Sequence, residues 1–176
     1  IIRKVFNISY VGGDGKELVA TDHPTWAGSQ SNELTAADLT EASLEDAMIR
    51  IMNMKDGRGL NIMAKPVKLI VSPSEAFNAY RILNATGQAN TTNLNNPNAI
   101  REMGWAPEVI VNPYLDDTDA WFLTTDIDNG LLHFKRKGLR FNEDGDFDTG
   151  NLKHKAQDRY SVGWADWRGI VGSAGA

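Results

Sequence analysis

The spacing of apolar residues predicts two helices in the first half of the chain. In the first, apolar residues recur every three or four positions, which is typical of an amphipathic helix: Leu44, Ala47, Met48, Ile51 and Met54. Ser43 is its expected N-cap, and the sequence DGRG at 56–59 ends it. The second helix follows SPSE at 72–75, with Ser72 as N-cap and Glu75 closing a capping box. Its predicted apolar face carries Ala76, Ala79, Tyr80 and Leu83.

Short apolar runs and alternating patterns predict strands in the rest of the chain. VKLIV at 67–71 is a continuous apolar run of the kind found in buried strands. PEVIVNPY and AWFLTTD predict two more strands joined by the turn LDDTD, and LLHFKRKGLRF predicts a third and a fourth that turn at Gly138. In the last strand, alternation predicts one face on a core, through Leu152, His154, Ala156, Tyr160 and Val162.

The segments between these elements contain many turn-forming residues. Residues 1–10 are expected to form the end of a helix that runs into a strand, and GGDG at 12–15 predicts a hairpin turn with ELVA as the returning strand. Residues 21–40 are expected to form a long irregular connection. The segment 84–98 is rich in Asn and Thr and almost uncharged, which indicates an exposed loop. Helices mixed with antiparallel strands in this way predict an α+β fold.

Composition excludes several classes of function. The chain has 176 residues, 18 basic and 23 acidic residues and a net charge of −5, so sequence-specific nucleic-acid binding is not expected. It contains no cysteine, which removes disulfides and cysteine-based metal sites. It has no apolar run of about 20 residues, so no membrane span is predicted. The basic patch KRK at 135–137, with Arg140, is interpreted as a solvated strand face that is also able to meet an acidic neighbour or a nucleic-acid backbone.

No motif predicts catalysis, and no catalytic, cofactor-binding or metal-binding residue is assigned. The acidic loop NEDGDFDTG at 142–150 spaces its aspartates like calcium ligands, but Lys155 stands where the bidentate glutamate is required. A solvated hairpin turn is therefore favoured there. In GGDGKE, Lys16 is followed by Glu17 and not by Ser or Thr, so it is no phosphate loop. The three histidines are far apart, and no GxSxG motif occurs.

The sequence DRYSVGWADWRGIVGS at 158–173 places Trp164 and Trp167 beside Arg168. A platform that stacks nucleic-acid bases needs more interleaved basic residues than one arginine. Aromatic residues beside an arginine are also typical anchors of protein interfaces. The hypothesis is that one tryptophan completes the protein's own core and the other packs at or near a subunit boundary.

Six segments, in order, carry a resemblance to a known family. They are YVGGDGKELVATDHP, LTAADLTEASLEDAMIRIMNMKDGRGL, KPVKLIVSPSEAFNAYRILN, EVIVNPYLDDTDAWFLTTD, GLLHFKRKG and FDTGNLKHKAQDRYSVGWADWRGIVGS. On these segments the chain resembles the major capsid (head) proteins of tailed bacteriophages and prophages, which have the Hong Kong 97-type fold. It is most similar to the Mu-like head-subunit branch.

The resemblance implies a structural protein of the virion and no enzyme. It implies an axial-lobe core at 43–130, a return to the axial lobe at 164–176, and peripheral-lobe elements at 1–42 and 131–163. The family's N-terminal arm, extended loop and most of its spine helix are expected to be missing from this chain. The loop 84–98 is expected to point toward the capsomer centre. The subunit-interface residues expected on this basis are Asn90, Asn93, Asn95, Trp164, Trp167 and Arg168.

The implied function is self-assembly, in the host cytoplasm, into pentameric and hexameric capsomers of an icosahedral shell. Its partners are then other copies of itself, packaged DNA bound without sequence specificity, and scaffold, portal or decoration proteins, with no membrane and no cofactor. Two alternatives stay open. One is an encapsulin-type compartment, which shares the fold but encloses enzymes. The other is a metal-dependent hydrolase on another α+β fold.

Overall fold

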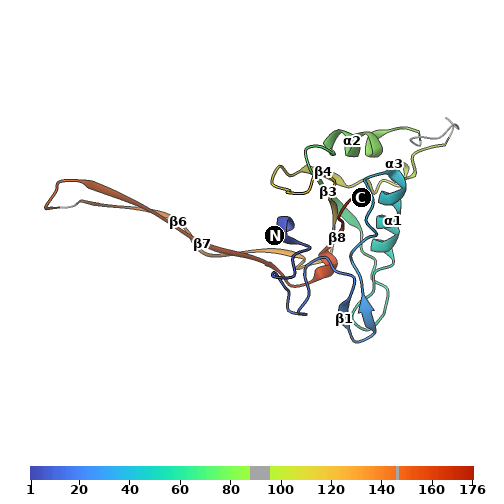
Figure 1. Cartoon of the computed structure of the whole chain (residues 1–176), viewed down its shortest axis with the longest axis horizontal. Helices are drawn as coiled ribbons and strands as arrows, with labels where there is room; N and C mark the ends of the chain where they lie inside the picture. The colour runs from blue at the N-terminus through green and yellow to red at the C-terminus, as the bar shows by residue number, and fades with distance from the viewer. Residues whose placement is uncertain (88–95, 146) are drawn as a thin grey trace.

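A four-stranded mixed sheet with helices on one face, and a long two-stranded ribbon that projects from it, make up the computed structural model (Figure 1). The structure describes residues 1–87, 96–145 and 147–176. The helices are η1 (Ile2–Lys4), α1 (Glu41–Met52), α2 (Ala76–Asn84), α3 (Ala99–Glu102) and η2 (Trp167–Gly169). The strands are β1 (His23–Thr25), β2 (Gly28–Gln30), β3 (Pro66–Val71), β4 (Glu108–Val111), β5 (Trp121–Thr125), β6 (Leu131–Gly145), β7 (Leu152–Trp164) and β8 (Ile170–Ser173). The α+β prediction is confirmed.

The central sheet has the order β4-β3-β5-β8, with β3 and β4 parallel and the other pairs antiparallel. Both faces of its centre are buried, and this explains the apolar runs Leu69–Val71 in β3 and Trp121–Leu123 in β5. Trp121 and Leu123 of β5 join the core beneath α1 and α2, whereas Phe122 packs on the opposite face with Val5 and Val19. Strand β8 near the end of the chain therefore lies in one sheet with β3, β4 and β5. Part of the N-terminal segment covers that sheet.

Both predicted helices are present, but each begins at a different residue from the one expected. The N-cap of α1 is Thr40, and Ser43 is its capping-box partner: the Ser43 N–H donates to Thr40 Oγ1, and the Thr40 N–H donates to Ser43 Oγ. The SPSE segment is a turn that precedes α2, and Ser72 is not the N-cap of this helix. Its hydroxyl instead donates to the carbonyl of Thr118. The buried residues of α2 are Ala79, Ile82 and Leu83. Tyr80, predicted on the apolar face, is 65% exposed.

The N-terminal part of the chain differs from the expectation at two places. Residues 2–4 form a short 3₁₀-helix followed by turns, and no strand follows it in residues 5–10. The expected hairpin at GGDG is reduced to one bridge between Val11 and Glu17. The connection 21–40 is more regular than expected, since β1 and β2 pair within it as an antiparallel hairpin.

The Asn-rich segment 84–98 is only partly described, because residues 88–95 lie outside the described residues. At its end, Asn98 is buried and not exposed as expected. Its side-chain oxygen accepts hydrogen bonds from the N–H groups of Ile100 and Arg101, and its amide donates to the carbonyl of Ile82 at 2.6 Å. Asn98 thus caps α3 and ties it to α2.

The largest difference from expectation is the ribbon formed by β6 and β7. Residues 131–145 form one continuous strand that passes through Gly138 without turning, and it pairs along its length with β7. Two irregularities, between Lys135 and Lys137 and between Lys137 and Arg140, absorb the extra residues of β6. The predicted core beneath β7 is absent from the described part of the chain, because nearly every ribbon side chain is exposed.

Candidate interaction surfaces

The ribbon β6–β7 has two chemically different faces, which follow from its pairing register. Directly paired residues share a face, and successive residues of a strand alternate between faces. One face, here called the apolar face, carries the apolar residues Leu131, Phe141, Leu152, Ala156, Tyr160, Val162 and Trp164. The polar or ionisable residues on the same face are His133, Lys135, Glu143, His154 and Asp158. Phe141 is 74% exposed and Tyr160 is 64% exposed. The alternation in the sequence correctly predicted two different faces. The prediction that this face packs on a core was wrong for the described residues, which leave it exposed.

The apolar face is large enough to be an interface. A strand of 13 residues, the length of β7, extends about 40 Å, and two strands are about 10 Å wide, so one face presents roughly 400 Å². Exposed apolar residues gathered on one face of a soluble protein are typical of interaction sites, and here charged residues lie between them. Leu152 and Phe147 extend the apolar character toward the far end of the ribbon, where Phe147 is fully exposed.

The end of the ribbon nearest the sheet is fixed by small residues and by Trp164. Gly130 and Gly169 pack so closely that a Cβ at position 130 would lie 2.8 Å from the Gly169 Cα. Trp164 is half-buried and packs against the core on the back of the sheet, and its indole Nε1 lies where a side chain at Gly12 would begin. The ribbon is thus joined to the body of the protein by a tightly packed junction.

The predicted interface residues Trp167 and Arg168 lie within the protein's own fold. The Trp167 ring is buried and stacks on His23, with the ring centroids 4.3 Å apart. The Arg168 guanidinium covers Trp167, donates to the Lys55 carbonyl at 2.7 Å and pairs with Asp166 at 3.2 Å. The structure thus gives both residues intramolecular contacts. Asn90, Asn93 and Asn95 lie outside the described residues, and the interface role of the six residues stays a prediction.

A buried asparagine joins this end-piece to the N-terminal segment. The Asn32 amide donates to three carbonyls, those of Leu18, Trp167 and Ile170, at 2.8–3.0 Å. Its side-chain oxygen accepts from the Ala20 N–H and from His23 Nε2, both at 3.0 Å. The other nitrogen of the His23 ring lies 2.6 Å from Asp14 Oδ2. Five hydrogen bonds on one side chain hold segments that are far apart in sequence.

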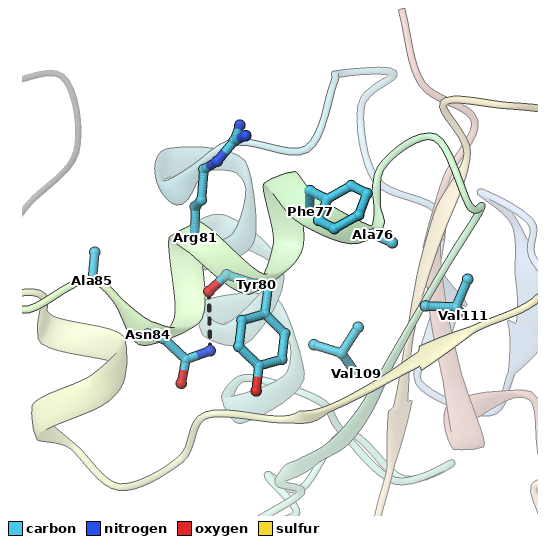
Figure 2. Close-up of a pocket in the computed structure, with 8 residues that line it drawn as sticks. All are labelled: Ala76, Phe77, Tyr80, Arg81, Asn84, Ala85, Val109 and Val111. Atoms are coloured by element: carbon cyan, nitrogen blue, oxygen red, sulfur yellow. Dashed lines mark hydrogen bonds between the residues drawn. The ribbon is translucent and has the colours of Figure 1, made fainter.

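A second exposed apolar surface, a groove of about 740 Å³, lies between α2 and the edge strand β4. Figure 2 shows the Tyr80 ring beside Val109, with Phe77 toward the other end of α2. The sequence analysis missed this groove because a single apolar stripe was assumed for α2. The signal was present, since Phe77 and Tyr80 add a second apolar row to the buried row of Ala79, Ile82 and Leu83.

Among residues 1–87, 96–145 and 147–176, no group of three His, Asp or Glu side chains is placed to hold a metal ion. The carboxylates of the LDDTD turn instead crowd one another. A side-chain hydrogen bond with Asp117 raises the pKa of Asp119, and the charges of Asp117 and Asp38 raise it further. No helix in the described part of the chain is long and apolar enough to span a membrane.

Comparisons with known proteins agree with a family of assembly proteins. A family model described as phage capsid protein matches residues 5–173. A search of curated proteins found no match. Eleven chains of solved structures match, among them one from Mycobacterium phage Che8 with 13% sequence identity and a TM-score of 0.47. That match covers 82% of this chain and 54% of the other, so this chain spans about half the length of that relative.

Proposed function

The chain belongs to the phage capsid protein family, and from this membership we propose that it is the structural subunit of a phage head that self-assembles into pentameric and hexameric capsomers. The capsomers build an icosahedral shell that encloses DNA, and the fold is of the Hong Kong 97 type in its Mu-like branch. Residues 43–130 and 164–176 form the axial lobe, and the ribbon belongs to the peripheral lobe. Scaffold, portal or decoration proteins are further partners.

The observation that carries this proposal is the exposed apolar face of the ribbon. A monomeric protein gains nothing by keeping Phe141 and Tyr160 in water on a ribbon without a core, because each buried aromatic side chain stabilises a fold by roughly 1.5–3 kcal/mol. A subunit of a closed shell covers such a face with its neighbours. Many modest contacts of this kind, repeated around symmetry axes, add up to a stable shell.

The groove between α2 and β4 is a second exposed apolar surface that supports the same proposal. Strand β4 is an edge strand, and Val111 on it is half-exposed beside Phe77. Edge strands flanked by apolar surface are frequent sites of association between chains. The ribbon extends away from the body that carries α2 and β4 (Figure 1), so the two apolar surfaces are separate.

The test is electron microscopy combined with mass measurement on the purified chain over a range of concentrations. The proposal predicts rings of five or six subunits, or closed shells, for the wild type. The double variant Phe141→Ser/Tyr160→Ser is expected to remain monomeric. Trp26→Ser is the matched control, because Trp26 is fully exposed and lies outside the ribbon. The proposal is contradicted if the wild-type chain stays monomeric at every concentration, both by itself and with further residues added before Ile1.

The same particles distinguish the head from a compartment shell. Particles that enclose nucleic acid, recognised by their absorbance ratio and by nuclease protection, support a phage head. Particles that enclose only protein support the encapsulin-type alternative.

A further inference from the structure

The second face of the ribbon, here called the basic face, carries a concentration of positive charge. The pairing register places Lys137 opposite Arg159, Arg140 opposite Gln157 and Lys155 opposite Asn142. Because these pairs alternate with those of the apolar face, their side chains all project from the other side of the ribbon. Lys153 lies on the same face, opposite Asp144, the single carboxylate among these positions.

The sequence alone separates these residues, and the structure brings them together. Lys137 and the three basic residues of β7, Lys153, Lys155 and Arg159, are 16 or more positions apart, and only the register of β6 and β7 aligns Lys137 with Arg159. Lys135 lies opposite Tyr160 on the apolar face. Arg140, Lys155 and Arg159 are exposed, and no ion pair neutralises these three within the part of the chain that the structure describes. Lys137 donates to the neutral Gln157 amide oxygen at 2.9 Å, so this contact leaves its charge in place.

The rest of the molecule has the opposite charge. Residues 131–164 contain seven basic and five acidic residues, whereas the remainder of the chain contains eleven basic and eighteen acidic residues. The body of the protein is therefore strongly acidic, and the ribbon that projects from it is basic on one face (Figure 1). Complementary charge of this kind steers association and orients partners in a complex.

We propose that the basic face of the ribbon docks on the acidic body of a second copy of this chain. The inference rests on the proposed function, and it gives the two faces of the ribbon different partners: the apolar face is buried by hydrophobic contact, and the basic face is held by charge. The contact is sensitive to salt, because exposed charges at separations near 10 Å are screened at about 0.1 M ionic strength.

Packaged DNA is the competing partner for a basic surface, since its phosphates attract lysine and arginine without sequence preference. The acidic body disfavours DNA, because a duplex that lies along the ribbon also approaches the negatively charged remainder of the same chain. A second copy instead offers that negative charge as the binding surface. The test separates the two partners.

The experiment measures self-association of the chain by titrating a fluorescently labelled sample with unlabelled protein at about 50 mM and about 300 mM NaCl. The wild type is expected to associate more weakly at the higher salt concentration. The double variant Lys155→Glu/Arg159→Glu is expected to associate roughly ten-fold more weakly than the wild type at low salt. The neutral variant Lys155→Gln/Arg159→Gln is expected to lie between the two.

The matched control is Lys55→Glu/Arg58→Glu, which changes the net charge equally at exposed positions outside the ribbon. It is expected to associate at least as strongly as the wild type, because it makes the acidic body of the partner copy more negative. The circular dichroism spectrum and the unfolding midpoint of each variant show whether it is folded. Equal weakening by both double variants, or none by either, overturns the proposal. So does a ribbon variant that associates normally but no longer binds a random-sequence DNA duplex, because the face is then a DNA-binding surface.

Failure of the proposed charge contact can be distinguished from failure of the proposed capsid function. Shells formed equally well by the wild type and by the ribbon variant leave the capsid function standing and overturn the charge contact. Salt-sensitive association of pairs without rings or shells supports the charge contact and contradicts the capsid function.

Discussion

Replacing Asn32 by alanine is expected to destabilise the fold more than any surface change. The substitution removes the acceptor of the buried Ala20 N–H and the partner of the buried His23 Nε2. Leaving a buried donor unsatisfied costs about 1–3 kcal/mol. It also removes donors to the carbonyls of Leu18, Trp167 and Ile170. The free energy of unfolding is therefore expected to fall by about 4 kcal/mol.

Urea denaturation followed by tryptophan fluorescence and by circular dichroism measures this loss. For an m-value of about 2 kcal/mol/M, a loss of about 4 kcal/mol lowers the midpoint by about 2 M. Asn61→Ala is the control, because Asn61 is exposed, and its change is expected within about 0.5 kcal/mol. A loss below about 1 kcal/mol for Asn32→Ala, with an unchanged m-value, would refute the reasoning and show that the five hydrogen bonds do not hold the end-piece.

Three further predictions concern local packing and charge. Thr40→Ala removes the capping box of α1 and is expected to cost about 1 kcal/mol in urea denaturation, whereas Ala42→Ser on the exposed side of the same turn changes little. Gly130→Ala forces a Cβ to within 2.8 Å of Gly169 and is expected to cost about 1–3 kcal/mol; an unchanged unfolding midpoint would show that the ribbon junction is loose. Asp119→Asn is expected to raise the melting temperature at pH 7 but not at pH 3. The raised pKa of Asp119, caused first by its hydrogen bond with Asp117, means that the charged carboxylate destabilises the folded state above the ordinary carboxyl pKa. Equal melting shifts at both pH values would contradict this explanation.

The central sheet was predictable from local sequence because burial on both faces leaves a simple signature. The runs that contain Leu69 and Leu123 are apolar at three successive positions, and their short length between turn residues favours a strand over a helix. Helix α1 was predictable for another reason: its apolar residues recur at helical spacing and leave the opposite face polar. Its first residue was predicted wrongly because Thr40 and Ser43 are both good caps, and only the geometry of the preceding chain selects Thr40.

The ribbon was harder to predict, because a glycine within a basic sequence resembles a turn. Gly138 instead lies within the strand beside an irregularity in the pairing, where a Cβ would meet only the flexible end of the Lys135 side chain, at 3.2 Å. Periodicity identified the apolar face correctly, but alternation only states that a face differs from its opposite. It does not state whether the same chain covers that face, because this depends on distant segments and on other subunits.

The same limitation applies to the interface residues. Trp164 and Trp167 are three residues apart and chemically alike, yet the first lies at the base of the ribbon and the second is buried against His23. Their different surroundings arise from the turn at Asp166, whose carboxylate accepts a hydrogen bond from the Arg168 N–H. The sequence pattern marked the pair as candidate anchors, and it did not state which of the two is buried in the protein's own fold.

The accessibility of the ribbon in assembled particles tests its role as the contact between subunits most directly. Because the chain has no cysteine, Tyr160→Cys introduces a single thiol on the apolar face, and its rate of labelling reports exposure. We expect rapid labelling in the isolated chain and labelling slowed roughly ten-fold or more in rings or shells. Trp26→Cys, far from the ribbon, is expected to label equally fast in both states. Equal rates at position 160 in isolated and assembled protein would contradict burial of the ribbon by neighbouring subunits.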